Sequence, residues 1–107
     1  MPFYVTSELP AVTPLPGVTR RVVALDGAML TIFDFAPHSV VPEHAHSNEQ
    51  ITFVVEGELD FTLGPETRRL RAGDVVAVPA NVPHGVVTGA RPARALDAWS
   101  PAREDYR

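Results

Sequence analysis

The chain has 107 residues, a net charge of −4, nine arginines without a lysine, and no cysteine. This length suits a single domain over residues 1–107, and the missing cysteines exclude disulfides, thiolate metal sites and cysteine nucleophiles. The sequence has no basic stripe of the kind that binds nucleic acid, and no run reaches the roughly 20 apolar residues of a membrane span. Met1–Val5 lacks a signal-peptide pattern, so we expect a cytoplasmic protein.

Short strand-like segments follow one another between turn residues. Residues 1–19, which include Pro14 and Pro16, are expected to form an irregular N-terminal arm. Strands are predicted over residues 21–25, 29–35, 51–55, 59–63, 67–71, 75–78, 84–88 and 93–99. Asp26-Gly27 and Glu56-Gly57-Glu58 are hairpin turns. Because eleven prolines and seven glycines leave little room for a long helix, the sequence predicts an all-β sandwich or barrel.

The hydrophobic pattern predicts how some strands are covered. Residues 59–63 alternate between apolar and polar, which is typical of a strand with one buried face. Residues 75–78 are apolar throughout, so we expect both faces of that strand to be covered. The arginines at positions 68, 69 and 71 are expected to lie on a solvent-facing side of their strand.

Three of the four histidines fall in two short segments. His44 and His46 are one residue apart, and on an extended chain both side chains point to the same face. They can therefore bind one metal ion together, because imidazole is the commonest metal ligand in proteins. His84 would reach the same ion from a distant strand, whereas His38 is expected in an exposed turn.

The two segments resemble the two sequence motifs of the cupin superfamily. The first, over residues 37–57, is carried by His44, His46, Gln50 and Gly57, with His38 in place of the opening glycine of the family. The second, over residues 73–88, is carried by Gly73, Pro79, Asn81, His84 and Thr88. Asn81 replaces a glycine of the family but still tolerates a positive φ. The resemblance implies a double-stranded β-helix, which is a jelly-roll barrel.

The resemblance also implies one divalent metal ion, bound by His44, His46, Gln50 and His84. Fe, Mn, Ni, Co and Zn all accept such ligands. Glu49 is the alternative to Gln50, but the spacing to Gly57 and the strand parity with residues 52 and 54 favour Gln50. A neutral glutamine leaves the ion its full charge, which favours Lewis-acid chemistry on a keto or enol oxygen.

The C-terminal segment resembles the end of small single-domain cupins of the pectin-degradation type, which help to open the ring of unsaturated uronates. This resemblance places Asp97 and Trp99 near the site. If Asp97 faces the cavity, it is the best proton carrier, whereas its structural alternative is a turn cap or an arginine partner. Trp99 fits either a pocket wall or the core. Arg103 could pair with a substrate carboxylate, or could be a solvated or dimer-contact residue.

Two classes of function are therefore expected. The first is a metal-dependent enzyme that acts on a small oxygenated acid by uronate ring opening, isomerisation or tautomerisation. The second is a module that binds or senses a small molecule without turnover, and a metal-dependent dioxygenase is a third alternative. A homodimer is expected, because exposed edges of small barrels invite pairing and related cupins commonly dimerise.

Overall fold

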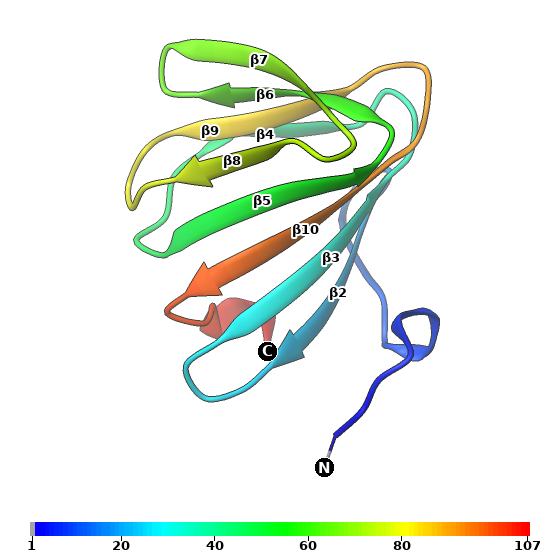
Figure 1. Cartoon of the computed structure of the whole chain (residues 1–107), viewed down its shortest axis with the longest axis vertical. Helices are drawn as coiled ribbons and strands as arrows, with labels where there is room; N and C mark the ends of the chain where they lie inside the picture. Colours follow the sequence, from blue (N-terminus) through cyan, green and yellow to red (C-terminus); the bar gives the residue numbers. More distant parts are fainter. Residues whose placement is uncertain (1) are drawn as a thin grey trace.

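Ten strands form two antiparallel sheets in the computed structural model, which describes residues 2–107 (Figure 1). The strands are β1 (Val12–Leu15), β2 (Val18–Ala24), β3 (Met29–Phe35), β4 (Val40–His44), β5 (Glu49–Glu56), β6 (Glu58–Leu63), β7 (Glu66–Arg71), β8 (Val75–Val78), β9 (His84–Thr88) and β10 (Ala93–Ser100). One sheet has the order β1-β2-β3-β10-β5-β8 and the other the order β4-β9-β6-β7. Short 3-10 helices span Thr6–Glu8 and Glu104–Tyr106. The predicted all-β barrel is confirmed.

The N-terminal arm is more regular than the sequence suggested. Its residues Val12–Leu15 form β1, which pairs with β2 at the edge of the six-stranded sheet, although the register shifts between Val12 and Leu15. Pro14 is tolerated there because an edge strand needs backbone donors on one side only. Strand β4 was also not predicted, since Pro42 and Glu43 interrupt its apolar pattern.

The predicted turn residues adopt the backbone conformations that their types favour. Asn81 has φ 65° and the exposed His38 has φ 56°, both in the left-handed region. Gly57 joins β5 to β6 with φ 71°, and a Cβ added there would lie 2.3 Å from the carbonyl oxygen of Pro92. Any side chain at position 57 would therefore push the β5–β6 hairpin away from the segment that enters β10.

In the six-stranded sheet, residues that pair directly across neighbouring strands form rows, here called levels. Successive levels point alternately to the interior and to the outer face. Trp99 pairs with Gln50, and Asp97 pairs with Thr52 and with Thr31, and all of these side chains are buried inside. Between these levels, Ala98 pairs with Leu30 and Ile51 on the outer face. Each residue of β10 therefore belongs to the cavity or to the outer surface according to its parity.

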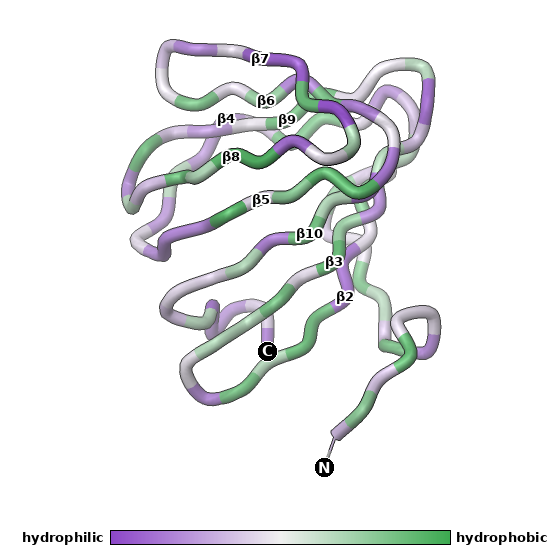
Figure 2. The backbone as a smooth tube through the Cα atoms, in the orientation of Figure 1, coloured by the Kyte–Doolittle hydropathy of each residue, from purple (hydrophilic) through white to green (hydrophobic). Residues whose placement is uncertain are grey.

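The outer faces of the two sheets differ in character. The outer face of the four-stranded sheet carries Arg69 and Arg71, whereas Arg68, also predicted to lie on this face, has the inward parity of Leu70 and is exposed because β7 is an edge strand. Hydrophilic residues follow β7, and apolar residues follow parts of β5 and β8 in the other sheet (Figure 2). The expectation that residues 75–78 are covered on both faces is wrong, because Val75 and Ala77 are exposed. Strand β8 is an edge strand, so no further strand of this chain covers its outer side.

The main core lies between the two sheets and is built from Val18, Phe35, Val54, Leu59, Phe61, Leu70, Val78, Ala93 and Ala95. A smaller cluster of Met29, Trp99 and Ala102 closes the end of the barrel near the C-terminal segment. Among residues 2–107, no helix has the length and apolar character needed to span a membrane.

Candidate metal centre

The three histidines of the two motifs come together at one end of the barrel. His44 ends β4 and pairs with His84, which begins β9, so the antiparallel ladder itself places the two rings side by side. His46 follows in the loop between β4 and β5, and its ring centroid lies 4.7 Å from that of His84. One ligand nitrogen from each ring lies within 4.8 Å of the others, so the three histidines could hold a metal ion.

Backbone carbonyls orient the three imidazoles. The Nδ1 atoms of His44, His46 and His84 lie 2.9, 3.0 and 2.8 Å from the carbonyl oxygens of Pro42, Asn48 and Val82. Because a carbonyl oxygen can only accept, each neutral ring carries its proton on Nδ1 and leaves a lone pair on Nε2. Burial lowers the pKa of His84, which favours this neutral form.

Gln50 adds an oxygen to the same cluster. Its Nε2 donates to Thr52 Oγ1 at 2.8 Å, which turns Oε1 toward His46 Nε2 at 3.1 Å. The Nε2 atoms of His46 and His84 are also 3.1 Å apart. Three acceptors at this separation repel one another unless a proton or a cation lies among them, so this nitrogen and oxygen set fits a divalent metal ion.

Glu49 lies on the other side of β5, where it is exposed, whereas Gln50 is buried. We therefore predict that Gln50→Ala lowers the metal affinity by at least about tenfold, and that Glu49→Ala leaves it within about twofold of the wild type. Competition with a fluorescent chelator measures both affinities. Metal loss in Glu49→Ala alone would show that the ligand register is shifted by one residue.

Asp97 faces the interior one level below Trp99, where its carboxylate is buried. Its Oδ1 has no hydrogen-bond partner among the described residues, and Thr52 is its only side-chain hydrogen-bond donor there. Burial raises the pKa of Asp97 to about 7, and the hydrogen bond from Thr52 opposes this only partly. A carboxyl that has one free oxygen and a pKa near neutrality is suited to proton transfer.

The raised pKa of Asp97 has a consequence for stability. The carboxyl is ionised above about pH 4 in the unfolded chain but only above about pH 7 in the folded one. The free energy of unfolding therefore decreases as the pH rises from about 4 to about 7. We expect metal-free Asp97→Asn to exceed the wild type in unfolding free energy by on the order of 2–4 kcal/mol above pH 7. The difference should vanish below pH 4. Urea unfolding at several pH values measures it, and a pH-independent difference would contradict the assignment.

Trp99 and Arg103 join the C-terminal segment to the histidine cluster. Trp99 is buried, and its Nε1 donates to Thr31 Oγ1 at 2.9 Å. The centroid of its ring lies 5.1 Å from that of His46. Arg103 lies with its guanidinium carbon 4.2 Å from the ring centroid of Tyr106 and 5.0 Å from that of Trp99. Asn48 Nδ2 donates to the carbonyl oxygen of Pro101 at 2.8 Å, which fastens the metal-binding loop to this segment.

A cavity of about 290 Å³ is lined by three of the four candidate ligands, but not by His46, and by Asp97, Trp99 and Arg103. Its polar lining comprises Arg20, Glu43, His44, Gln50, His84, Asp97, Arg103 and Tyr106. Its deep end is apolar, with Val18, Phe33, Phe35 and Phe61 among the lining residues. A larger hollow beside β7 and β8, lined by Arg68, Arg69 and Asp74, contains none of the histidines. The smaller cavity is thus the one that combines candidate ligands, a buried acid and an apolar lining.

Sequence reasoning had not singled out Arg20 or Tyr106. A signal existed for Arg20, because it lies between Val18 and Val22 on the inward face of β2, where an arginine interrupts an apolar alternation. Tyr106 gave no such signal. It reaches the cavity through a 3-10 helix beyond the last strand, and strand parity says nothing about the direction of such a segment.

Comparisons with known proteins agree with this geometry. The structure of KdgF from Halomonas sp. superposes with a TM-score of 0.93 at 30% identity, and the match covers 100% of this chain and 99% of that one. H2HPP isomerase of Bacillus subtilis is 46% identical over 50 residues, and the dimethylsulfoniopropionate lyase DddQ of Ruegeria pomeroyi is 42% identical over 59 residues. These matches cover 21% and 29% of the two curated relatives, so the chain matches less than a third of each.

The family model described as "Cupin domain" matches residues 31–99, which is more than half of the chain and contains both histidine motifs. The similarity to KdgF confirms the predicted resemblance to the small cupins of the pectin-degradation type. By sequence, fold and the placement of its three histidines, the chain belongs to the cupin family.

Proposed function

We propose that this cupin is a metal-dependent enzyme that acts on a small oxygenated acid, by uronate ring opening or by isomerisation or tautomerisation of a related keto acid. One observation carries the proposal: three of the four candidate metal ligands line the same small cavity as a buried carboxyl that has one oxygen without a hydrogen bond. The similarity to KdgF supports the uronate reaction, and the similarity to a protein named H2HPP isomerase supports an isomerisation.

The residues divide the work between binding and proton transfer. A divalent ion held by the three histidines and Gln50 supplies Lewis-acid polarisation of a keto or enol oxygen. Asp97 moves a proton at the carbon next to that oxygen, since its pKa of about 7 allows it both to accept and to donate near neutral pH. Thr52 holds this carboxyl in place from the neighbouring strand, and Trp99 walls the cavity above it.

The test is to incubate the metal-loaded chain with unsaturated galacturonate and related keto acids and to follow each compound by NMR. Turnover that stops on chelation and returns when metal is added supports the proposal. Binding of one compound without chemical change would favour the binding-module alternative. Turnover that requires oxygen would favour the dioxygenase.

We also propose that two copies pair through the outer face of the six-stranded sheet. Leu30, Ile51, Phe53 and Val75 are each between 39% and 54% exposed on that face. Together they present roughly 300–400 Å² of apolar surface, about half of the ~800 Å² that each partner contributes to a standard interface. Apolar neighbours such as Ala98 and Ala77 enlarge the patch, and a two-fold axis parallel to the sheet plane would let one patch cover the other.

We therefore expect light scattering to give the mass of a dimer at micromolar concentration, and Ile51→Lys to give that of a monomer with unchanged metal content. Val87→Lys, a change at an exposed valine of the other sheet, is the matched control and should stay dimeric. A monomeric wild type would contradict the proposal.

A further inference from the structure

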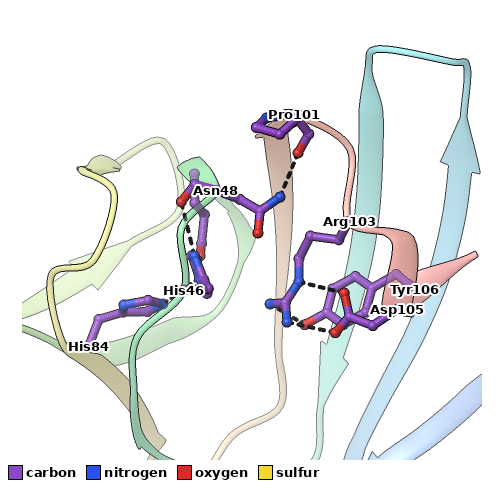
Figure 3. A network of polar contacts seen from close by, with 8 residues as sticks. His46, Asn48, His84, Pro101, Arg103, Asp105 and Tyr106 are labelled. Atoms are coloured by element: carbon purple, nitrogen blue, oxygen red, sulfur yellow. Dashed lines mark hydrogen bonds and ion pairs between the residues drawn. The ribbon is translucent and has the colours of Figure 1, made fainter.

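Two arginines line the cavity, and they differ in how their donors are used. Each of the three guanidinium nitrogens of Arg103 donates a hydrogen bond within the C-terminal segment. Its Nε and Nη2 donate to the two carboxylate oxygens of Asp105 at 3.1 and 2.7 Å, and its Nη1 donates to the hydroxyl of Tyr106 at 3.1 Å (Figure 3). A substrate carboxylate would have to displace Asp105 to reach this fork.

Arg20 has no such partner. Within residues 2–107 it makes no ion pair, and its Nε is buried without a hydrogen bond. Its guanidinium carbon lies over the ring of Tyr106, 3.9 Å from the centroid. The next residue, Arg21, belongs to the other face of β2 and is paired with Asp34 at 3.2 Å. An arginine that is turned inward and left without a carboxylate is unusual, because buried charges are ordinarily paired.

The acidic residues near Arg20 do not form an ion pair with it. Asp105 is held by Arg103, whose hydrogen bond is the main cause of the lowered pKa of Asp105, and the charge of Arg20 contributes only at longer range. Glu43 also lines the cavity, from β4, but it makes no ion pair with Arg20. The stacking on Tyr106 uses the face of the guanidinium and leaves the N–H groups at its edge available.

We propose that Arg20 binds the carboxylate of the substrate and so gives this cavity its preference for acids over neutral compounds. The proposal rests on the proposed function for the identity of the reacting acid, but not for the binding itself. A carboxylate accepts two parallel hydrogen bonds from the planar fork of an arginine. Arg103 is then a positioning residue, which holds Tyr106 against Arg20 and does not itself bind the acid.

Strand register places this carboxylate site opposite the metal ligands. Arg20 pairs with Phe33 of β3, and Phe33 pairs with Ala95 of β10, one level deeper than Asp97. An acid anchored at Arg20 would therefore extend toward the metal cluster past Asp97, so that its reacting carbon lies between the proton carrier and the ligand atoms. Substrate orientation, and not affinity alone, follows from this residue.

The experiment titrates the metal-loaded protein with D-galacturonate and with D-galactose, which has the same ring without the carboxylate. Isothermal calorimetry is carried out on the wild type, Arg20→Gln, Arg20→Lys and the matched control Arg21→Gln. We expect the wild type and the control to prefer the acid. Arg20→Gln should lose about 10- to 100-fold in affinity for galacturonate without a change for galactose. Arg20→Lys should lose less, because a lysine keeps the charge but not the fork.

Three results would overturn the proposal: a wild type without preference for the acid, an unchanged preference in Arg20→Gln, or an equal loss for both sugars, which would indicate a structural role. Turnover of unsaturated galacturonate in the same variants separates this proposal from the proposed function. If the wild type shows no turnover but an acid preference that depends on Arg20, the proposed reaction fails and the carboxylate site stands.

Discussion

Replacing either His46 or His84 by alanine is expected to abolish tight binding of a divalent metal. Each ring presents Nε2 to the same point, because its Nδ1 is tied to a backbone carbonyl. Neither role can pass to a neighbour, since His38, the fourth histidine, lies in an exposed turn outside the cluster. Changes in groups that merely orient ligands already cost about 10- to 100-fold in affinity, so loss of a ligand should cost at least as much.

Metal per chain is measured by mass spectrometry after dialysis against a weak chelator. The control is His38→Asn, because asparagine tolerates the positive φ of this position and the substitution removes a histidine without touching the cluster. The control should retain the metal content of the wild type. Wild-type metal content in both His46→Ala and His84→Ala would refute the assignment of the site.

Asp97→Asn is expected to keep the metal and to lose most of the turnover. The amide has nearly the same shape and can stay on Thr52, but it cannot take up or release a proton at the position of Oδ1. Positioned acid–base groups contribute about 10²- to 10⁴-fold, so a loss of this size in kcat is expected on unsaturated uronates or related keto acids.

Two controls accompany this measurement. The metal content of Asp97→Asn must match that of the wild type, and Asp60→Asn, which alters an exposed ion pair with Arg69, should remain fully active. Full activity of Asp97→Asn would make Asp97 a structural residue and assign the proton transfer to a metal-bound water or to another group.

Local sequence pattern predicted most strands of the barrel, and the resemblance to the cupin motifs added the candidate metal ligands. The spacing between His44 and His46 and the parity of Gln50 with Thr52 are properties of extended chain, so they could be read without tertiary information. The same reasoning correctly predicted a strand over residues 75–78 but wrongly predicted that both of its faces are covered. An apolar run does not tell whether its outer side contacts another part of the chain or is exposed.

The surroundings of Arg20 and Arg103 could not be predicted from local sequence pattern. Arg20 approaches Tyr106 across more than eighty residues of sequence, and their contact exists only because the C-terminal segment folds back against the barrel. The partner of Arg103 was equally hidden. Its fork could have served a ligand until the structure placed Asp105 within hydrogen-bond distance.

Along β10, the residues beside the candidate metal ligands are separate from the residues that shape the deeper part of the cavity. Trp99 lies beside the candidate ligand Gln50, Asp97 lies one level deeper, and Ala95 and Ala93 lie deeper still, against Phe33 and Phe35. Neighbouring levels are about 7 Å apart, so a larger or smaller side chain near Ala95 alters the room for a substrate without moving a ligand atom. Point mutations at the end of the barrel that holds Ala93 and Ala95 can thus change the size and shape of the cavity over generations, while the candidate metal ligands are inherited unchanged.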